Sequence, residues 1–136
     1  MQPLFLDTSY LLALELADDG NHGVAIKHWS EIVANLPPLI TTSYIFSELV
    51  TFFNSRGLHD KAIKFGRSLL RSQSVTLIHV DETLFHQGWI YFEKHRDKKY
   101  SLTDGISFLV MQKNSITDAL TFDKHFDQAG FRTIPS

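Results

Sequence analysis

The sequence contains no cysteine among its 136 residues. This absence excludes disulfide bonds and thiolate metal sites and is consistent with a reducing compartment, so we expect a cytoplasmic protein. No uninterrupted apolar run approaches the roughly 18 residues of a membrane span, so no membrane association is expected. The N-terminal segment lacks a basic leader, and Asp7 and Glu15 interrupt its apolar run, which predicts no signal peptide.

Several catalytic motifs are also missing. The sequence has no G-x-x-x-x-G-K-[ST] segment, which excludes a P-loop nucleotide-binding site. It has neither H-E-x-x-H nor a cysteine set, which argues against a zinc hydrolase. A haloacid-dehalogenase-type phosphatase would need a second aspartate two residues after Asp7, and that position is Ser9.

What is present is typical of a globular protein. Hydrophobic residues make up 43% of the chain and charged residues 21%, and the length predicts one domain over residues 1–136. The net charge of −2 is uneven, because residues 1–55 carry −5, residues 56–99 carry +4 and residues 100–136 carry −1. The basic middle is a candidate surface for an anionic partner; a solvated helical face is the alternative explanation.

Short apolar, β-rich segments alternate with segments of helical period. The pattern predicts strands at 3–7, 39–42, 75–80, 118–123 and 132–135, and helices at 9–16, 22–36, 43–57, 60–72, 82–95 and 102–113. In the second helix, the spacing places Val33 on the buried face. The alternation predicts an α/β fold with a mainly parallel sheet and helices on both of its faces.

Four acidic residues fall where such a fold would bring them together. Asp7 and Asp123 follow predicted strands, and the carboxyl ends of parallel strands share one edge of the sheet. Asp104 lies in the first turn of a helix that begins at that edge, and Glu48 lies one to two turns into another. Converging carboxylates repel one another unless a cation neutralises them, and Mg²⁺ or Mn²⁺ with oxygen ligands would do so.

Each acid also has a purely structural explanation. The segment SLTD at 101–104 has the form of a capping box, in which Asp104 would only support the start of a helix. Asp7 could cap a helix, and Asp123 could belong to a turn. Glu48 stands within YIFSELVTFF, beside an apolar face where a carboxylate needs a partner, which favours a functional role.

Taken together, the stretches around these acids resemble the PIN domain, a family of metal-dependent nucleases that includes the VapC toxins of toxin–antitoxin pairs. The matching stretches are FLDTSYLLAL, TTSYIFSELVTFF, YSLTDGISFLVM and ALTFDKHFDQAGFRTIP, and the resemblance covers essentially the whole chain. It implies a single Rossmann-like domain with about five parallel strands flanked by helices. It also implies that the catalytic acids Asp7, Glu48, Asp104 and Asp123 hold one or two Mg²⁺ or Mn²⁺ ions and hydrolyse RNA.

The resemblance extends to hydroxyl residues beside the acids, and it suggests partners. Thr8, Ser9 and Thr121 are expected to orient the carboxylates. The expected contacts to the RNA backbone lie in the loop EKHRDKKY, with the basic helix 60–72 as a second candidate; the loop residues are Lys94, Arg96, Lys98 and Lys99. Toxins of this family are usually homodimers neutralised by an antitoxin, so we expect both partners here.

Other functions remain open at this point. An RNA-processing nuclease without an antitoxin would use the same acids, whereas a non-catalytic RNA- or protein-binding domain would have no need of them. A metal-free ribonuclease would use two histidines, but the seven histidines form no recognisable pair. His125, two residues after Asp123, is expected to have a packing or supporting role. Asp127 is expected to face solvent.

Overall fold

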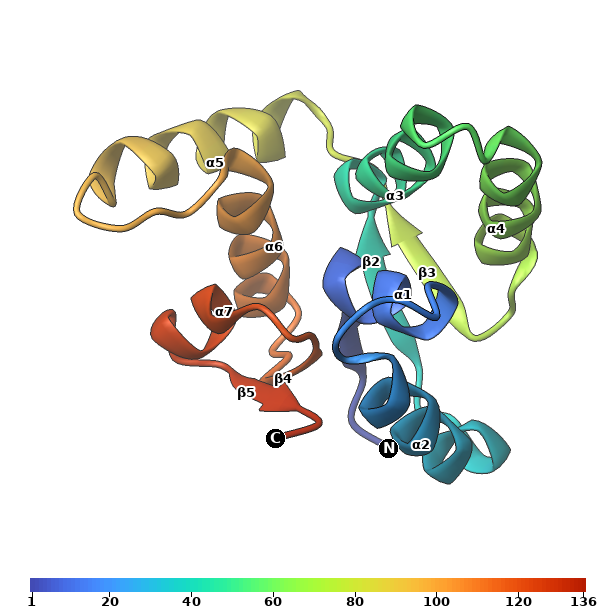
Figure 1. The fold of residues 1–136 in the computed structure, drawn as a ribbon. Helices are drawn as coiled ribbons and strands as arrows, with labels where there is room; N and C mark the ends of the chain where they lie inside the picture. Colours follow the sequence, from blue (N-terminus) through green and yellow to red (C-terminus); the bar gives the residue numbers. More distant parts are fainter.

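Five parallel strands form the central sheet of the computed structural model, which describes residues 1–136 (Figure 1). Their order across the sheet is β3-β2-β1-β4-β5, and every neighbouring pair is parallel. The strands are β1 (Leu4–Leu6), β2 (Leu39–Thr42), β3 (Val75–Ile78), β4 (Asp118–Leu120) and β5 (Arg132–Ile134). The predicted α/β fold with about five parallel strands is therefore confirmed.

Seven α-helices connect the strands. They are α1 (Thr8–Glu15), α2 (His22–Ile32), α3 (Ser43–Ser55), α4 (His59–Arg71), α5 (Glu82–Lys94), α6 (Leu102–Lys113) and α7 (Lys124–Gln128). Helix α5 packs mainly on α6 and extends away from the sheet, as Figure 1 shows. None of the helices has the length and hydropathy needed to cross a bilayer.

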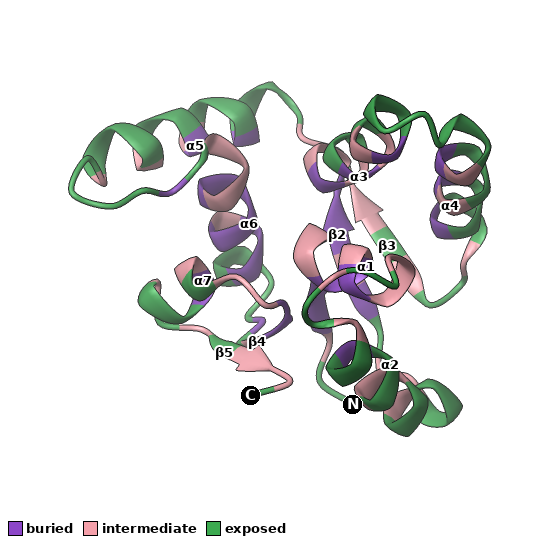
Figure 2. Cartoon of the chain, viewed as in Figure 1, coloured by how far each residue is buried: buried purple, intermediate pink, exposed green.

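The sheet separates two apolar cores. Along β1, Phe5 belongs to the core under α6 and α7, whereas Leu4 and Leu6 belong to the core under α1, α3 and α4. Successive side chains of a strand point to opposite faces of the sheet. Because both faces of β1 are covered by a core, all three of its residues are apolar and buried. Figure 2 shows the buried residues concentrated in β1, β2, β4 and α6, whereas β3 and β5 are only partly buried and α5 is mostly exposed.

Capping residues and glycines in the sequence determine where most of the helices begin or end. Asp81 caps α5 by accepting a hydrogen bond from the Leu84 backbone N–H at 2.8 Å, as its position in the sequence predicts. After α3, Gly57 has a φ of +74°, a left-handed conformation that glycine adopts without steric cost.

The structure corrects two expectations. The helix predicted over 22–36 ends at Ile32 and tightens into a 3₁₀ turn over Val33–Asn35, so that Val33 is 46% exposed and not buried. The tighter winding rotates this side chain out of the helical stripe. The strand predicted over 118–123 ends at Leu120, and the short helix α7 that follows was not predicted.

Candidate functional site

Asp7 lies between β1 and α1, at the carboxyl edge of the sheet, and caps α1. Its Oδ2 accepts hydrogen bonds from the hydroxyls of Ser9 and Thr121, both at 2.7 Å. Those hydroxyl oxygens each accept a backbone N–H at 2.9 Å, from Phe122 and Asp123 respectively. The amide protons occupy lone pairs of the hydroxyls, which directs the hydroxyl protons to Asp7 and ties β1 to the segment after β4.

The charge of Asp7 is costly in this position. The residue is only 8% exposed, and burial raises the pKa of its carboxyl from 3.8 to about 6, with the neighbouring Asp123 charge acting in the same direction. Hydrogen bonds from Ser9 and Thr121 lower the pKa and offset part of this effect. At neutral pH, Asp7 is therefore an ionised, largely buried carboxylate that a nearby cation would stabilise.

Asp104 takes part in a complete capping box at the start of α6. The Ser101 hydroxyl accepts the Asp104 backbone N–H, and Asp104 Oδ2 accepts the Ser101 backbone N–H, both at 3.0 Å. The same Oδ2 lies 2.8 Å from Nδ1 of His125. Asp104 therefore supports the start of α6 and also contacts a side chain on α7, 21 residues further along the chain.

Asp123 caps α7 and stands beside the same histidine. Its Oδ1 accepts the His125 backbone N–H at 2.9 Å and lies 3.5 Å from the ring nitrogen Nδ1. One possible metal-ligating atom from each of Asp104, Asp123 and His125 lies within 4.8 Å of the others. The fold thus brings Asp104 and Asp123 together, with Asp7 linked to them through Thr121.

Glu48 lies apart from this group. It is exposed on α3, and its Oε1 accepts a hydrogen bond from the Thr8 hydroxyl at 3.3 Å. Thr8 follows Asp7 in the chain and opens α1, so the contact places Glu48 next to the acidic edge. The three hydroxyl residues expected to orient carboxylates therefore contact two different acids. Ser9 and Thr121 donate hydrogen bonds to Asp7, and Thr8 donates one to Glu48.

The PIN-domain model matches residues 4–132 of this chain. The chain belongs to the PIN-domain family. Curated relatives named 23S rRNA-specific endonuclease VapC20, from two Mycobacterium tuberculosis strains, CDC 1551 / Oshkosh and ATCC 25618 / H37Rv, are 36% identical over 129 residues, which is 94% of this chain and 95% of theirs. The resemblance to PIN domains that include VapC toxins is therefore confirmed.

Solved structures agree with this assignment. The crystal structure of M. tuberculosis VapC20, described as a sarcin–ricin loop cleaving toxin, superposes with a TM-score of 0.84 and 34% identity over 94% of this chain and 95% of its own. The FitAcB structure from Neisseria gonorrhoeae has a TM-score of 0.66 at 15% identity, over 96% of this chain and 95% of its own. The second likeness shows the shared fold alone.

From the sequence of this PIN domain, His125 was expected to have only a packing or supporting role. Its ring packs edge-on against Tyr100, with ring centroids 5.4 Å apart and planes at 76°. The contact between His125 and Asp104 joins residues 21 positions apart, so a short sequence pattern cannot predict it. The available signal was the position of His125 two residues after an acid that follows a strand. Asp127, by contrast, is exposed as expected.

The loop between α5 and α6 leads directly to the acidic edge. The basic residues of this loop and of the last turn of α5 are all exposed and form no ion pair with any acid; they are Lys94, at the end of α5, and Arg96, Lys98 and Lys99 in the loop. The next residue, Tyr100, is buried and contacts the ring of His125. The loop is thus anchored beside the acids while its charges face solvent.

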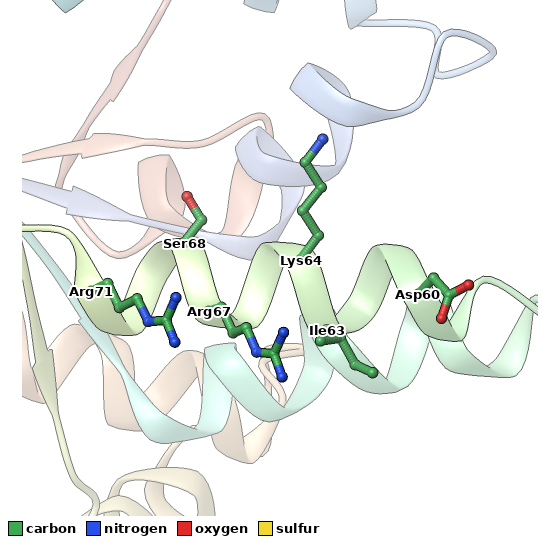
Figure 3. A pocket seen from close by; sticks show the side chains of 6 residues that line it. All are labelled: Asp60, Ile63, Lys64, Arg67, Ser68 and Arg71. Atoms are coloured by element: carbon green, nitrogen blue, oxygen red, sulfur yellow. The ribbon is translucent and has the colours of Figure 1, made fainter.

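A second basic surface lies on α4. Lys64, Arg67 and Arg71 line an open hollow of about 570 Å³ on this helix, together with Asp60 (Figure 3). None of the three forms an ion pair. Helix α4 packs on α3, which carries Glu48, so this surface is one helix removed from the acidic edge.

Proposed function

We propose that this PIN-domain protein is a divalent-metal-dependent ribonuclease and the toxin of a toxin–antitoxin pair. The observation that carries the proposal is the approach of Asp104 and Asp123 at the carboxyl edge of the sheet, with the buried Asp7 tied to the same edge. The relatives named for 23S rRNA and the sarcin–ricin loop match nearly the whole chain. We extend their substrate class to this chain and propose a structured loop of ribosomal RNA.

The residues at this edge fit Mg²⁺ or Mn²⁺. Oδ1 of Asp7 has no hydrogen-bond partner in the protein, so its lone pairs are free for a cation. Asp7, Asp104 and Asp123 would hold the ion through carboxylate oxygens, the ligands that these cations prefer. When bound, such an ion lowers the pKa of a water molecule and offsets charge on the phosphodiester in the transition state.

Other side chains would position the reacting groups. Ser9 and Thr121 fix the orientation of Asp7, because both donate to one of its oxygens. Glu48, held by Thr8 through one oxygen, has its second oxygen free either to ligate the ion or to orient the attacking water. Lys94 at the end of α5 and the three basic residues of the following loop would hold the RNA backbone, which positions the substrate without specifying its sequence.

The test compares cleavage of an RNA hairpin by the parent and two variants. The parent should cleave with Mg²⁺ or Mn²⁺, stop in EDTA, and leave no 2′,3′-cyclic phosphate, because water and not the 2′-hydroxyl attacks phosphorus. Asp123→Asn should lose more than about 100-fold in rate, since removing even a residue that supports a metal ligand costs 10–100-fold. Asp127→Asn, an exposed acid on the same short helix, should retain activity.

Two results would count against this function. Full cleavage in EDTA with cyclic-phosphate ends would favour a histidine mechanism. Metal-dependent cleavage without growth arrest on expression in cells would favour an RNA-processing nuclease over a toxin. The toxin proposal expects arrest by the parent, none by Asp123→Asn, and rescue by a small antitoxin encoded beside the gene.

A further inference from the structure

His125 stands closer to the paired acids than a packing role requires. Its Nδ1 is 2.8 Å from Asp104 Oδ2 and 3.5 Å from Asp123 Oδ1. Adjacent ligands of an octahedral ion that binds at about 2.1 Å lie roughly 3 Å apart, because they subtend about 90° at the ion. The 2.8 Å distance is close to this spacing and the 3.5 Å distance somewhat exceeds it, so the ring nitrogen is near enough to both carboxylates to share one ion with them.

The ring is held in this position from two sides. The backbone N–H of His125 is fixed by Asp123 at the start of α7, and the ring packs edge-on against Tyr100. Tyr100 is 6% exposed and packs in turn on the fully buried Phe108, with centroids 5.1 Å apart. A ring fixed in this way is aimed at the acids before any ion arrives, which reduces the entropy lost on binding.

We infer that His125 is a direct nitrogen ligand of the divalent ion, so that the site selects Mn²⁺ over Mg²⁺. The inference rests on the proposed metal site, and it adds a donor that the four acids do not supply. Carboxylate oxygens suit Mg²⁺ and Mn²⁺ alike, so they do not separate the two ions. An imidazole nitrogen does, because a transition metal such as Mn²⁺ gains from a nitrogen ligand where Mg²⁺ gains little. The side chain is 28% exposed, so an ion can reach it from solvent.

The test uses Mn²⁺ itself as the probe and does not need activity. Mn²⁺ bound to the parent protein should show ¹⁴N coupling from a directly bound imidazole in pulsed electron paramagnetic resonance. His125→Asn should lose this coupling, and its Mn²⁺ affinity should fall at least about tenfold, while Mg²⁺ affinity changes much less. The control is His95→Asn, because His95 also packs on Tyr100 but bonds the Tyr91 carbonyl and no acid.

The outcomes separate this inference from the proposed function. Mn²⁺ that binds the parent without ¹⁴N coupling would leave the metal site intact and overturn the ligand role of His125. Equal losses of Mn²⁺ and Mg²⁺ affinity in His125→Asn would also overturn it, because a residue that only holds Asp104 by a hydrogen bond would weaken both ions alike. Absence of any Mn²⁺ or Mg²⁺ binding to the parent would defeat both proposals. The spectrum of the parent decides the ligand question even if the variant folds poorly.

Discussion

The carboxylate of Asp7 makes the stability of the metal-free protein depend on pH. Its pKa is about 6 in the folded protein and 3.8 in an unperturbed chain. Between these values the folded state holds more protons than the unfolded state, so the free energy of unfolding decreases as pH rises from about 4 to about 6. A shift of two pKa units corresponds to about 3 kcal/mol, which is lost in full above that range.

Asp7→Asn should remove this pH dependence. In EDTA above pH 7 the variant should be more stable than the parent by up to about 3 kcal/mol, because the amide carries no charge and still accepts from the neighbouring hydroxyls. Urea unfolding of both proteins from pH 4 to 8 measures the difference, with Asp127→Asn as a control for an exposed acid. Added Mg²⁺ should stabilise the parent by about 2.7 kcal/mol at 100 times its dissociation constant, and the variant much less. Identical pH profiles for parent and Asp7→Asn would contradict the burial argument.

Asp104 shows how far sequence reasoning reaches at the scale of one residue. Its capping box with Ser101 was predictable, because the interaction spans three residues and depends only on local helix geometry. Its contact with His125 joins two different helices and depends on how α6 and α7 pack. From sequence, the start of a helix at the sheet edge allowed Asp104 to serve both as a cap and as a site residue; in the structure, the same oxygen serves the cap and contacts the histidine.

At the scale of elements, periodicity was sufficient wherever an element is long or fully buried. All five strands and the six longer helices were predicted, because buried parallel strands are continuous apolar runs and amphipathic helices repeat every 3.6 residues. Helix α7 has only five residues, too few for a period to be visible. The exposure of Val33 depends on a 3₁₀ turn before Pro37-Pro38, which periodicity does not report.

The end of α5 and the loop that follows it should dominate RNA binding. We expect replacement of their basic residues by alanine to weaken binding and to flatten its salt dependence, by about 0.7 in the logarithmic slope per lost phosphate contact on single strands. The residues are Lys94, Arg96, Lys98 and Lys99, which are exposed beside the anchored Tyr100. Binding of an uncleaved RNA to the metal-free protein, measured at several salt concentrations, gives the slope.

The matched control removes basic residues from the other charged surface. Lys64, Arg67 and Arg71 on α4 carry a similar charge but lie one helix away from the acidic edge. A short hairpin that fills the acidic edge should bind this triple variant with nearly the parental slope. If both variants reduce the salt dependence of binding equally, RNA is attracted to basic surfaces in general. If the loop variant leaves the salt dependence unchanged, its basic residues do not contact RNA and only face solvent.

At the scale of the whole molecule, α5 presents an apolar stripe that nothing in the chain covers. Phe85, Trp89 and Phe92 recur at helical spacing and are 38%, 46% and 40% exposed, and the rings of Trp89 and Phe92 stack 5.6 Å apart. We propose that a second copy covers this stripe. An antiparallel pairing about a twofold axis near Trp89 would set Phe85 against Phe92 of the other copy. It would also set the acidic start of α5, at Glu82, near the basic end of the other copy's α5, at Lys94.

Trp89→Lys should therefore convert a dimer into a monomer. A stable dimer buries about 800 Å² per partner around a centre rich in aromatic residues, and a charge at that centre would be desolvated without a partner. Light scattering on the eluting parent should give twice the chain mass of 15.6 kDa, and the variant should give that mass once. Val24→Lys changes an equally accessible apolar residue on α2, 53% exposed, and should leave the dimer intact.

A parent that is monomeric at about 100 times the concentration used for RNA cleavage would rule out the dimer. Dissociation by Val24→Lys but not by Trp89→Lys would place the interface on α2. Because Trp89 is exposed and lies outside both cores, loss of the dimer without loss of the fold is the outcome that the α5 stripe predicts.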